Sequence, residues 1–309
     1  MRELLEKYSL APKKGYGQNF LVNRDIPHRI ASSAAAGCDV GYGDAPAVRG
    51  AVLEIGPGIG SMTRELSELF ERVIALEIDR ALIPLLDETL GDLDNVKVIN
   101  EDFLKLDLAK LLDDEAKDLP VFVCANLPYY VTTPVLMKIL EDLPPLGAPR
   151  ITSVTVMIQS EVADRLCATE KDSEYGAVTA SVALHGEAKK LFTVAPGNFY
   201  PAPKVTSSVV QITLHKNGIC DVYPEAPKEA SECGEFIRRV KRLIELAFMK
   251  RRKTLTNALS GEFSKEDVEE ALGKMGLRTD IRGERLSARD FCALSDLLSA
   301  DCQQLKTNG

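Results

Sequence analysis

The fold is decided by the stretch Val52-Leu53-Glu54-Ile55-Gly56-Pro57-Gly58-Ile59-Gly60. It joins a short apolar run, residues 51–55, to residues 61–70, where Met62, Leu66 and Leu69 recur at helical spacing. Glycines at such a turn let the chain bend sharply and let its backbone approach a ligand. The stretch therefore predicts the first β-α unit of an α/β sheet with a ligand site at its edge.

The same alternation of apolar runs and amphipathic segments continues along the chain. Further strands are predicted at residues 72–78, 96–100, 121–125 and 151–158, and helices at residues 81–90, 134–143 and 161–168. Strands that are apolar throughout and alternate with helices indicate a parallel sheet covered on both faces. Two later strands, residues 189–194 and 207–215, flank a proline-rich turn.

The two ends of the chain follow other patterns. Residues 1–36 are expected to be mostly helical with a loop at 13–20, and residues 37–50, rich in glycine, are expected to form a loop. Helices are predicted at residues 236–249, 265–275 and 288–298. We expect one domain over residues 1–215, a linker at 216–234 where large apolar side chains are scarce, and a small all-helical domain at 235–309.

Composition excludes several classes of protein. The 309 residues include 38 Lys and Arg against 46 Asp and Glu, which gives a net charge of −8 and excludes a uniformly basic nucleic-acid coat. No apolar run approaches the roughly 18 residues of a membrane span. The 7 cysteines form no C-x-x-C pair, so we expect free thiols, no metal site and a cytoplasmic location. The 3 scattered histidines are not expected to be catalytic, and the acidic residues within 112–118 are expected in a solvated loop or helix end.

Three acidic residues suggest which ligand the glycine turn binds. The G-x-G-x-G spacing differs from the G-x-G-x-x-G of pyrophosphate loops. A carboxylate at Glu54 would repel an anion but suit a sulfonium and an ammonium, which favours S-adenosylmethionine over NAD. Glu77 ends the second strand, where it can accept both ribose hydroxyls, and Asp102 follows the third, where it can accept an adenine amino group. The alternative is a tight structural turn with two solvated acids.

The tetrapeptide Asn126-Leu127-Pro128-Tyr129 follows the fourth strand and suits methyl transfer to an adenine amine. That amine is a poor nucleophile because its lone pair is delocalised into the ring. The Asn126 side-chain oxygen and the Leu127 carbonyl can accept its hydrogens, and Pro128 stiffens the turn. Tyr129 can stack on the base. Such catalysis needs positioning and electrostatics and no strong base. The alternative is an ordinary turn with an exposed tyrosine.

With these features the sequence resembles the small-subunit ribosomal RNA adenine N6,N6-dimethyltransferases, relatives of the macrolide-resistance large-subunit enzymes. The matching stretches, which run from about residue 15 to about 298, are Gly17-Gln18-Asn19-Phe20-Leu21, Glu54-Ile55-Gly56-Pro57-Gly58-Ile59-Gly60, Glu77-Ile78-Asp79, Glu101-Asp102, Asn126-Leu127-Pro128-Tyr129-Tyr130, Phe199-Tyr200-Pro201-Ala202-Pro203-Lys204-Val205, Lys250-Arg251-Arg252-Lys253-Thr254-Leu255 and Gly283-Glu284-Arg285-Leu286-Ser287. The loop at 37–50 is longer than is typical of the family.

The resemblance implies a Rossmann-like class I methyltransferase sheet and a helical RNA-binding domain. It implies dimethylation of two adjacent adenosines near the 3′ end of small-subunit rRNA, within an immature subunit, by a monomer that binds no membrane. By position, the cofactor would be bound by Asn19, Leu21, Gly56, Gly58, Glu77, Asp102 and Asn126. Asn126 would face the target amine, and Tyr129 and Phe199 would flank the base.

The densest positive charge lies on the predicted helix at residues 236–249 and directly after it. We predict an RNA phosphate-contact patch there, extended by Lys13, Lys14 and Lys204, and centred on Arg238, Arg242, Lys250, Arg251, Arg252 and Lys253. The alternative reading of the charges alone is a solvated helix face.

Three alternative functions stay open at this point. They are a large-subunit methyltransferase of macrolide resistance, a binding factor that serves assembly or transcription without catalysis, and a nicotinamide dehydrogenase.

Overall fold

The computed structural model describes residues 7–8, 17–36, 48–144, 146–147, 149–250 and 252–307, and of residues 300–307 the helical backbone alone. Lys13, Lys14, Arg251 and most of the loop predicted at 37–50 lie outside this set. The chain divides into two compact units. One, the sheet unit, comprises residues 1–143, 150–163 and 188–214, and the other, the helical unit, comprises residues 144–149, 164–187 and 215–309.

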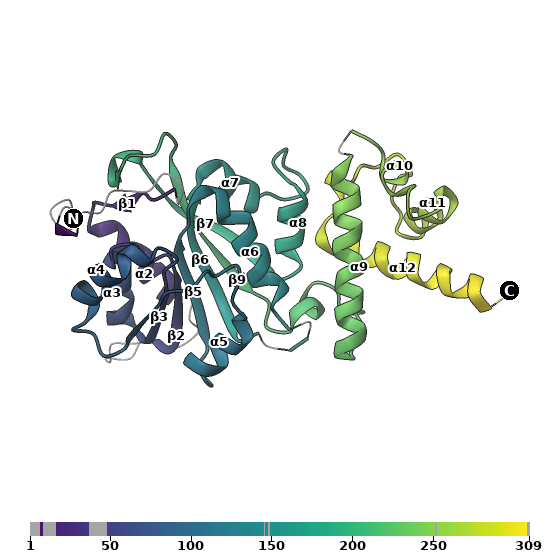
Figure 1. Ribbon diagram of the computed structural model, residues 1–309. Helices are drawn as coiled ribbons and strands as arrows, with labels where there is room; N and C mark the ends of the chain where they lie inside the picture. The colour runs from purple at the N-terminus through teal and green to yellow at the C-terminus, as the bar shows by residue number, and fades with distance from the viewer. Residues whose placement is uncertain are drawn as a thin grey trace. The chain divides into compact units, whose positions relative to one another are not determined.

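The strands of the sheet unit confirm the predicted alternation of strands and helices (Figure 1). Seven strands form the main sheet, namely β2 (Val48–Ile55), β3 (Phe70–Leu76), β4 (Val96–Ile99), β5 (Val121–Asn126), β6 (Ile151–Gln159), β7 (Gly186–Val194) and β9 (Ser207–Leu214). A two-stranded sheet pairs β1 (Phe20–Leu21) with β8 (Phe199–Tyr200). The helices that accompany these strands are α2 (Asp25–Ala36), α3 (Ser61–Leu69), α4 (Ile83–Leu90), α5 (Leu108–Glu115), α6 (Thr132–Glu141) and α7 (Ser160–Leu166).

The strand order is β4-β3-β2-β5-β6-β9-β7. Neighbours from β4 to β6 are parallel, and β9 is antiparallel to β6. Six consecutive residues of β2 are buried, so both faces of this strand are covered, as expected for a parallel sheet with helices on both sides. The chain builds outward from β2 through β3 to β4 and then returns to place β5 on the other side of β2. Ligands of open α/β sheets bind at such a switch point, beyond the carboxyl ends of the strands.

The helical unit packs around its own core. Its helices are α8 (Ala177–Ala183), α9 (Ala230–Met249), α10 (Leu255–Leu259), α11 (Lys265–Lys274) and α12 (Ala288–Thr307). Phe236, Leu243 and Phe291 are buried in this core, and the Tyr175 hydroxyl donates to the Leu286 carbonyl at 2.9 Å. No helix in the described part of the chain is long and apolar enough to cross a bilayer. Of the 7 cysteines, Cys124, Cys220 and Cys292 are free thiols in the described part of the chain.

The segment predicted as a linker, residues 216–234, is instead packed into the helical unit. Ile219, Tyr223 and Ala226 are buried there, and the Tyr223 ring stacks on Phe236 with centroids 5.8 Å apart. The last five residues of the segment already belong to α9. A few apolar side chains are enough to pack an irregular segment against a core. The composition of the segment alone does not reveal this packing.

Another expectation differs from the structure. Residues 164–187, expected in the first domain, group with the helical unit, because Tyr175, Ala180 and Leu184 are buried in its core. Part of the acidic cluster at 112–118 forms the end of α5, which confirms the predicted helix end. Its Glu115 is mostly buried and pairs with Arg72 at 2.7 Å and with Lys97.

Candidate active site

A cavity opens at the carboxyl ends of β2, β3 and β5, at the switch point of the sheet. Its empty volume is about 1210 Å³ including the open mouth. It brings together every cofactor and base residue predicted from the sequence, namely Asn19, Leu21, Gly56, Gly58, Glu77, Asp102, Asn126, Leu127, Pro128, Tyr129 and Phe199.

The glycine turn forms one wall of this cavity. Gly56 has φ +77° and Gly58 has φ +61°, backbone conformations that residues with a Cβ rarely adopt. A Cβ at Gly56 would meet nothing within 4 Å, because the position faces open space. The Gly56 amide donates to the Leu76 carbonyl at 2.9 Å, which ties the turn to β3. No side chain therefore separates the Gly56 backbone from the space where a ligand would lie.

Glu77 is fixed by its neighbours before any ligand arrives. One carboxyl oxygen accepts the Gly58 amide at 3.1 Å, and the other accepts the Asp79 amide at 2.8 Å. The Asn100 side chain donates to the Glu77 carbonyl at 2.6 Å. Burial raises the pKa of the Glu77 carboxyl above its usual value, while the two backbone amides oppose the rise. An oriented acceptor thus lies beside the glycine turn.

Asp102 lies at the outer part of the same cavity. Its carboxyl group accepts the Leu104 amide at 3.0 Å and pairs with the exposed Lys105 at 3.4 Å. Two large apolar side chains nearby are unusually open to solvent, Ile78 at 48% and Leu104 at 39%. Exposed apolar side chains beside a hydrogen-bond acceptor suit a flat heteroaromatic ring with an amino group.

Glu54 requires a change to the electrostatic interpretation made from the sequence. The residue lines the cavity, but its side chain is fully buried, and neither carboxyl oxygen has a hydrogen-bond partner among the described residues. Burial raises the pKa of the Glu54 carboxyl to about 8, while the neighbouring Thr63 hydroxyl, which lies outside hydrogen-bond geometry, opposes the rise and Glu77 adds slightly to it. Without a ligand the group is therefore mainly protonated at neutral pH, and it is not the standing negative charge that the sequence suggested. A cationic ligand group would give it a partner and favour ionisation.

Asn126 ends β5 and presents its amide to the cavity. Its side-chain nitrogen donates to the Asn19 carbonyl at 3.3 Å, so the side-chain oxygen is the end left to accept from a ligand. The Asn19 side chain donates in turn to the Gly17 carbonyl at 2.9 Å. Leu127 buries its side chain, and its amide donates to the Met157 carbonyl at 3.2 Å. The tetrapeptide is therefore held from both the amino-terminal segment and β6.

The two aromatic residues predicted to flank a base are held in different ways. Phe199 is buried. It lies in β8, opposite Leu21 of β1 in the two-stranded sheet. Tyr129 lies in a single turn of 3-10 helix after Pro128, and its hydroxyl contacts the Ser207 hydroxyl at 3.0 Å. Both rings line the cavity, with Phe199 as part of a packed wall and Tyr129 as a side chain on a turn.

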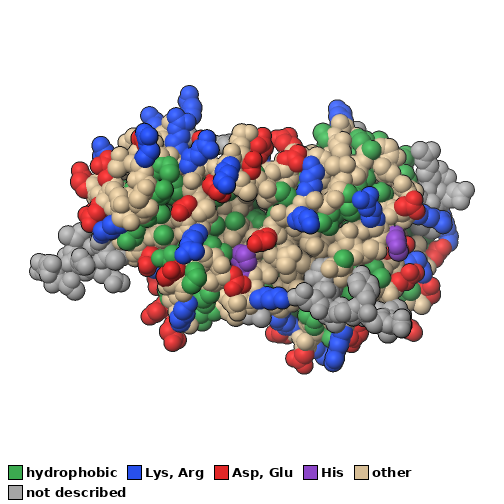
Figure 2. Space-filling model, turned by 180° about the vertical axis from the view of Figure 1, so that it is seen from behind, with side chains coloured by type: hydrophobic (Ala, Val, Ile, Leu, Met, Phe, Trp, Pro, Cys, Tyr) green, Lys and Arg blue, Asp and Glu red, His purple; other side chains and the backbone are tan. Residues whose placement is uncertain are grey.

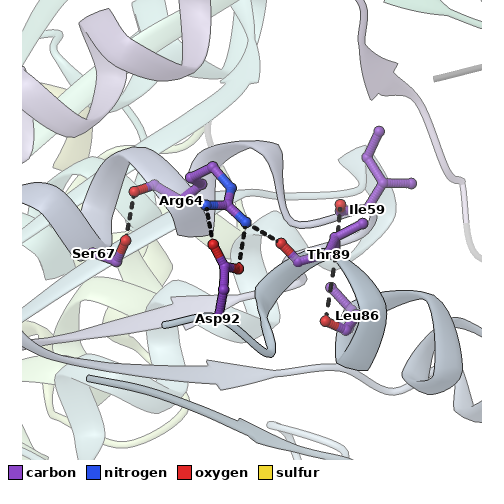
Figure 3. A network of polar contacts seen from close by, with 6 residues as sticks. All are labelled: Ile59, Arg64, Ser67, Leu86, Thr89 and Asp92. Carbon is purple, nitrogen blue, oxygen red and sulfur yellow. Dashed lines mark hydrogen bonds and ion pairs between the residues drawn. The ribbon is translucent and has the colours of Figure 1, made fainter. Parts of the chain in front are cut away.

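A polar network ties the exit of the glycine turn to the end of α4 (Figure 3). The Arg64 guanidinium pairs with Asp92, with N–O distances of 2.7 and 3.0 Å, and donates to the Thr89 carbonyl. The Thr89 hydroxyl contacts the Ile59 carbonyl at 3.5 Å. This network lies at the surface of the sheet unit and holds α3 and the last residues of the glycine turn against α4.

The predicted basic patch belongs to the helical unit. Figure 2 shows Lys and Arg side chains gathered at the top of the unit that carries α9, on the left in this view. Arg238, Lys250, Arg252 and Lys253 are exposed. Arg242 is different, because its guanidinium donates to Glu262 at 2.9 Å and pairs with Glu245 at 3.3 Å. Its charge is largely neutralised within the protein.

Sequence reasoning missed several residues that shape the cavity. Ser207 contacts Tyr129, Asn100 supports Glu77, and the Gln18 side chain donates to Asp79 at 3.2 Å. Gln18 and Asp79 lie within two of the stretches that match the family, Gly17-Gln18-Asn19-Phe20-Leu21 and Glu77-Ile78-Asp79. Their place in these stretches could have identified them as site residues. Ser207 follows Tyr129 by 78 residues, and no local pattern marks it.

The comparisons with known proteins agree with the class that fold and site define, a Rossmann-like nucleic-acid methyltransferase. Two solved structures share this fold at low identity. They are the 23S rRNA methyltransferase ErmE (TM-score 0.65, 24% identical, covering 91% of this chain and 100% of that one) and a dimethyladenosine transferase from Plasmodium falciparum (TM-score 0.67, 22% identical, covering 89% and 95%).

Sequence comparison identifies the family. Residues 10–300 match the ribosomal RNA adenine dimethylase family, and the chain belongs to it. Among curated relatives, the ribosomal RNA small subunit methyltransferase A of Shouchella clausii is 40% identical over 300 residues, covering 96% of this chain and 92% of the relative. The protein of the same name from Clostridioides difficile is 37% identical over 301 residues, covering 96% and 94%.

Proposed function

We propose that this protein transfers methyl groups from S-adenosylmethionine to the N6 amines of two adjacent adenosines near the 3′ end of small-subunit rRNA. The observation that carries the proposal is the convergence of the glycine turn, Glu77, Asp102 and Asn126 on one cavity. The small subunit is favoured over the large one because relatives at about 40% identity over nearly the whole chain bear the small-subunit name.

The cavity fits the cofactor at three points. Glu77 is oriented to accept ribose hydroxyls, and Ile78 and Leu104 would cover the faces of the adenine while Asp102 accepts its amino group. The orphaned Glu54 carboxyl and the bare backbone at Gly56 suit the positively charged end. When bound, S-adenosylmethionine would supply an electrophilic methyl group on a sulfonium centre, whose carbon an amine nitrogen can attack in line as the sulfur leaves as a thioether.

The chain's own residues would prepare the amine. The Asn126 side-chain oxygen and the Leu127 carbonyl accept the two amino hydrogens, which draws the nitrogen lone pair out of the ring and toward the methyl group. Tyr129 and Phe199 hold the extruded base on its two faces. The nitrogen–carbon bond would form as the sulfur–carbon bond breaks and the sulfur leaves as a neutral thioether, and the methylated amine would then lose a proton to water. Positioning and electrostatics account for the acceleration, without a covalent enzyme intermediate.

The helical unit would bind the RNA backbone. Arg238, Lys250, Arg252 and Lys253 are exposed cations on a protein of net charge −8, so they form a local attraction for phosphates. We further propose that the protein acts as a monomer in the cytoplasm and that it recognises an immature small subunit. RNA shape would carry most of the selectivity, because A-form grooves hide base edges from side chains.

The decisive experiment offers labelled S-adenosylmethionine with undermethylated small subunits and, separately, with naked large-subunit rRNA. Modified nucleotides are then mapped by mass. We expect N6,N6-dimethyladenosine at two adjacent positions of the small-subunit RNA only. Label in the large-subunit RNA would establish the macrolide-resistance activity instead, and no label in either RNA would favour a non-catalytic assembly factor.

An Asn126→Ala variant tests the catalytic assignment. Removing the acceptor should lower the rate of methyl transfer by about 100- to 1000-fold, the effect of losing one oriented group that acts in the transition state. Cofactor affinity, measured by calorimetry, should fall far less than the rate, because the other cofactor-binding residues remain in place. Methylation of small subunits at the parental rate would show that Asn126 has another role.

A further inference from the structure

Ser207 makes a contact with the base-stacking tyrosine that the proposed mechanism does not use. Its hydroxyl oxygen lies 3.0 Å from the Tyr129 hydroxyl oxygen, a hydrogen bond in which either group can donate. Ser207 is only 1% exposed, whereas Tyr129 is partly open to the cavity. A buried hydroxyl thus contacts the far end of a side chain that lines the site.

The sheet register explains why these two residues meet. At the end of β5, Asn126 is paired with Met157 of β6, and at the start of β9, Ser207 is paired with Gln159 of β6. Because β9 runs antiparallel to β6, its first residue lies at the edge where the parallel strands end. Ser207 is therefore fixed by two strands, while Tyr129 lies on a single 3-10 turn that no side chain caps.

We infer that Ser207 is a positioning residue that holds the Tyr129 ring as a preformed stacking surface for the target adenine. The inference rests on the proposed function. A tyrosine on a short turn loses rotamer freedom when a base stacks on it, and this lost freedom opposes binding. With its hydroxyl tied to a buried serine, the ring has already lost much of that freedom. Ser207 itself does not touch the base or the cofactor.

A double-mutant cycle with Ser207→Ala and Tyr129→Phe tests the inference, since phenylalanine keeps the ring and removes only the hydroxyl. Each single variant should lower kcat/KM on undermethylated small subunits by about threefold to tenfold, the range expected for one ordinary hydrogen bond. The double variant should be no slower than the slower single variant, because both changes break the same bond. The KM for S-adenosylmethionine should not change.

The adjacent Ser208 supplies a matched control. It is also a fully buried serine of β9, and its hydroxyl contacts the Ser160 hydroxyl at 2.8 Å rather than the site. Ser208→Ala should lower the free energy of unfolding about as much as Ser207→Ala, since each removes one buried serine hydrogen bond. It should leave kcat/KM on small subunits within about twofold of the parent, because it does not contact Tyr129.

Two results would overturn the inference. One is a Ser207→Ala variant that methylates small subunits at the parental rate while Tyr129→Phe is slow. The other is a double variant that loses activity in proportion to both single losses, which would indicate a general structural effect. Failure of the proposed function is distinguishable from either result, because the parental protein would then transfer no methyl group to small subunits.

Discussion

The sheet unit and the helical unit hold their predicted functional residues in different ways. In the sheet unit, Glu77 and Asn126 are each fixed by backbone or side-chain partners at the ends of parallel strands. In the helical unit, the predicted cations lie on the surface, and Arg242 is neutralised by Glu262 and Glu245. Chemistry at a chosen atom needs positions fixed before binding, whereas attraction to a phosphate backbone needs only accumulated charge. Substitutions in one unit should therefore leave the task of the other intact.

The largest expected effect is in the sheet unit. Glu77→Gln keeps the shape of the side chain but removes its negative charge and one of its two oxygen acceptors. The side chain can then no longer accept hydrogen bonds from two backbone amides and two ribose hydroxyls together. We expect cofactor affinity, measured by calorimetry, to fall about a hundredfold, in line with hydrogen bonds to a charged group. Binding of small-subunit RNA should persist. Loss of RNA binding together with cofactor binding would contradict the separation of tasks.

The next effect should come from the helical unit. Arg252→Ala combined with Lys253→Ala removes two exposed cations and should weaken RNA binding about tenfold at low salt. The slope of the salt dependence should fall by about one unit for each phosphate that the variant no longer neutralises. Arg242→Ala is the control and should have a much smaller effect, because its charge is already paired. Filter binding across a salt series measures both. Equal effects of the two variants would show that the ion pair with Glu262 opens on RNA.

A pH dependence should follow from Glu54. Its pKa is raised from 4.5 to about 8 in the folded protein, so the folded state keeps a proton that the unfolded chain releases as the pH rises between these values. The free energy of unfolding should therefore fall with rising pH over this window, relative to Glu54→Gln, by at most about 1.4 kcal/mol per pH unit. Urea unfolding of both proteins from pH 5 to pH 8 would measure it. A constant difference across the series would mean that Glu54 is ionised in the folded protein.

The smallest effect is expected at the surface network of Figure 3. Arg64→Ala should lower the free energy of unfolding by about 1 kcal/mol or less, as for other exposed ion pairs, and should weaken cofactor binding about twofold through the glycine turn. Arg150→Ala is a matched control, because Arg150 also pairs with an exposed aspartate, Asp113, and donates to a backbone carbonyl at 2.9 Å. It should destabilise the protein similarly and leave cofactor affinity unchanged.

Much of the sheet unit could be predicted because its signals are local. Apolar runs between amphipathic segments gave the strands β2, β3, β4, β5 and β6, and the position of Glu77 and Asn126 at strand ends placed them at one edge of the sheet. The helical unit was predicted less completely. Residues 164–187 and 216–226 lack a strong period, and only their burial against α9 and α12 assigns them to this unit.

The amino-acid sequence by itself determined the parallel sheet, the glycine turn and the set of polar residues that line the cavity, because strand periodicity and strand-end position are properties of neighbouring residues. Only the tertiary structure decided the protonation of Glu54, the pairing of Arg242 with Glu262, and the contact of Ser207 with Tyr129. Each of these depends on which distant groups surround a side chain and how much water reaches it, and neither quantity is encoded in a local pattern.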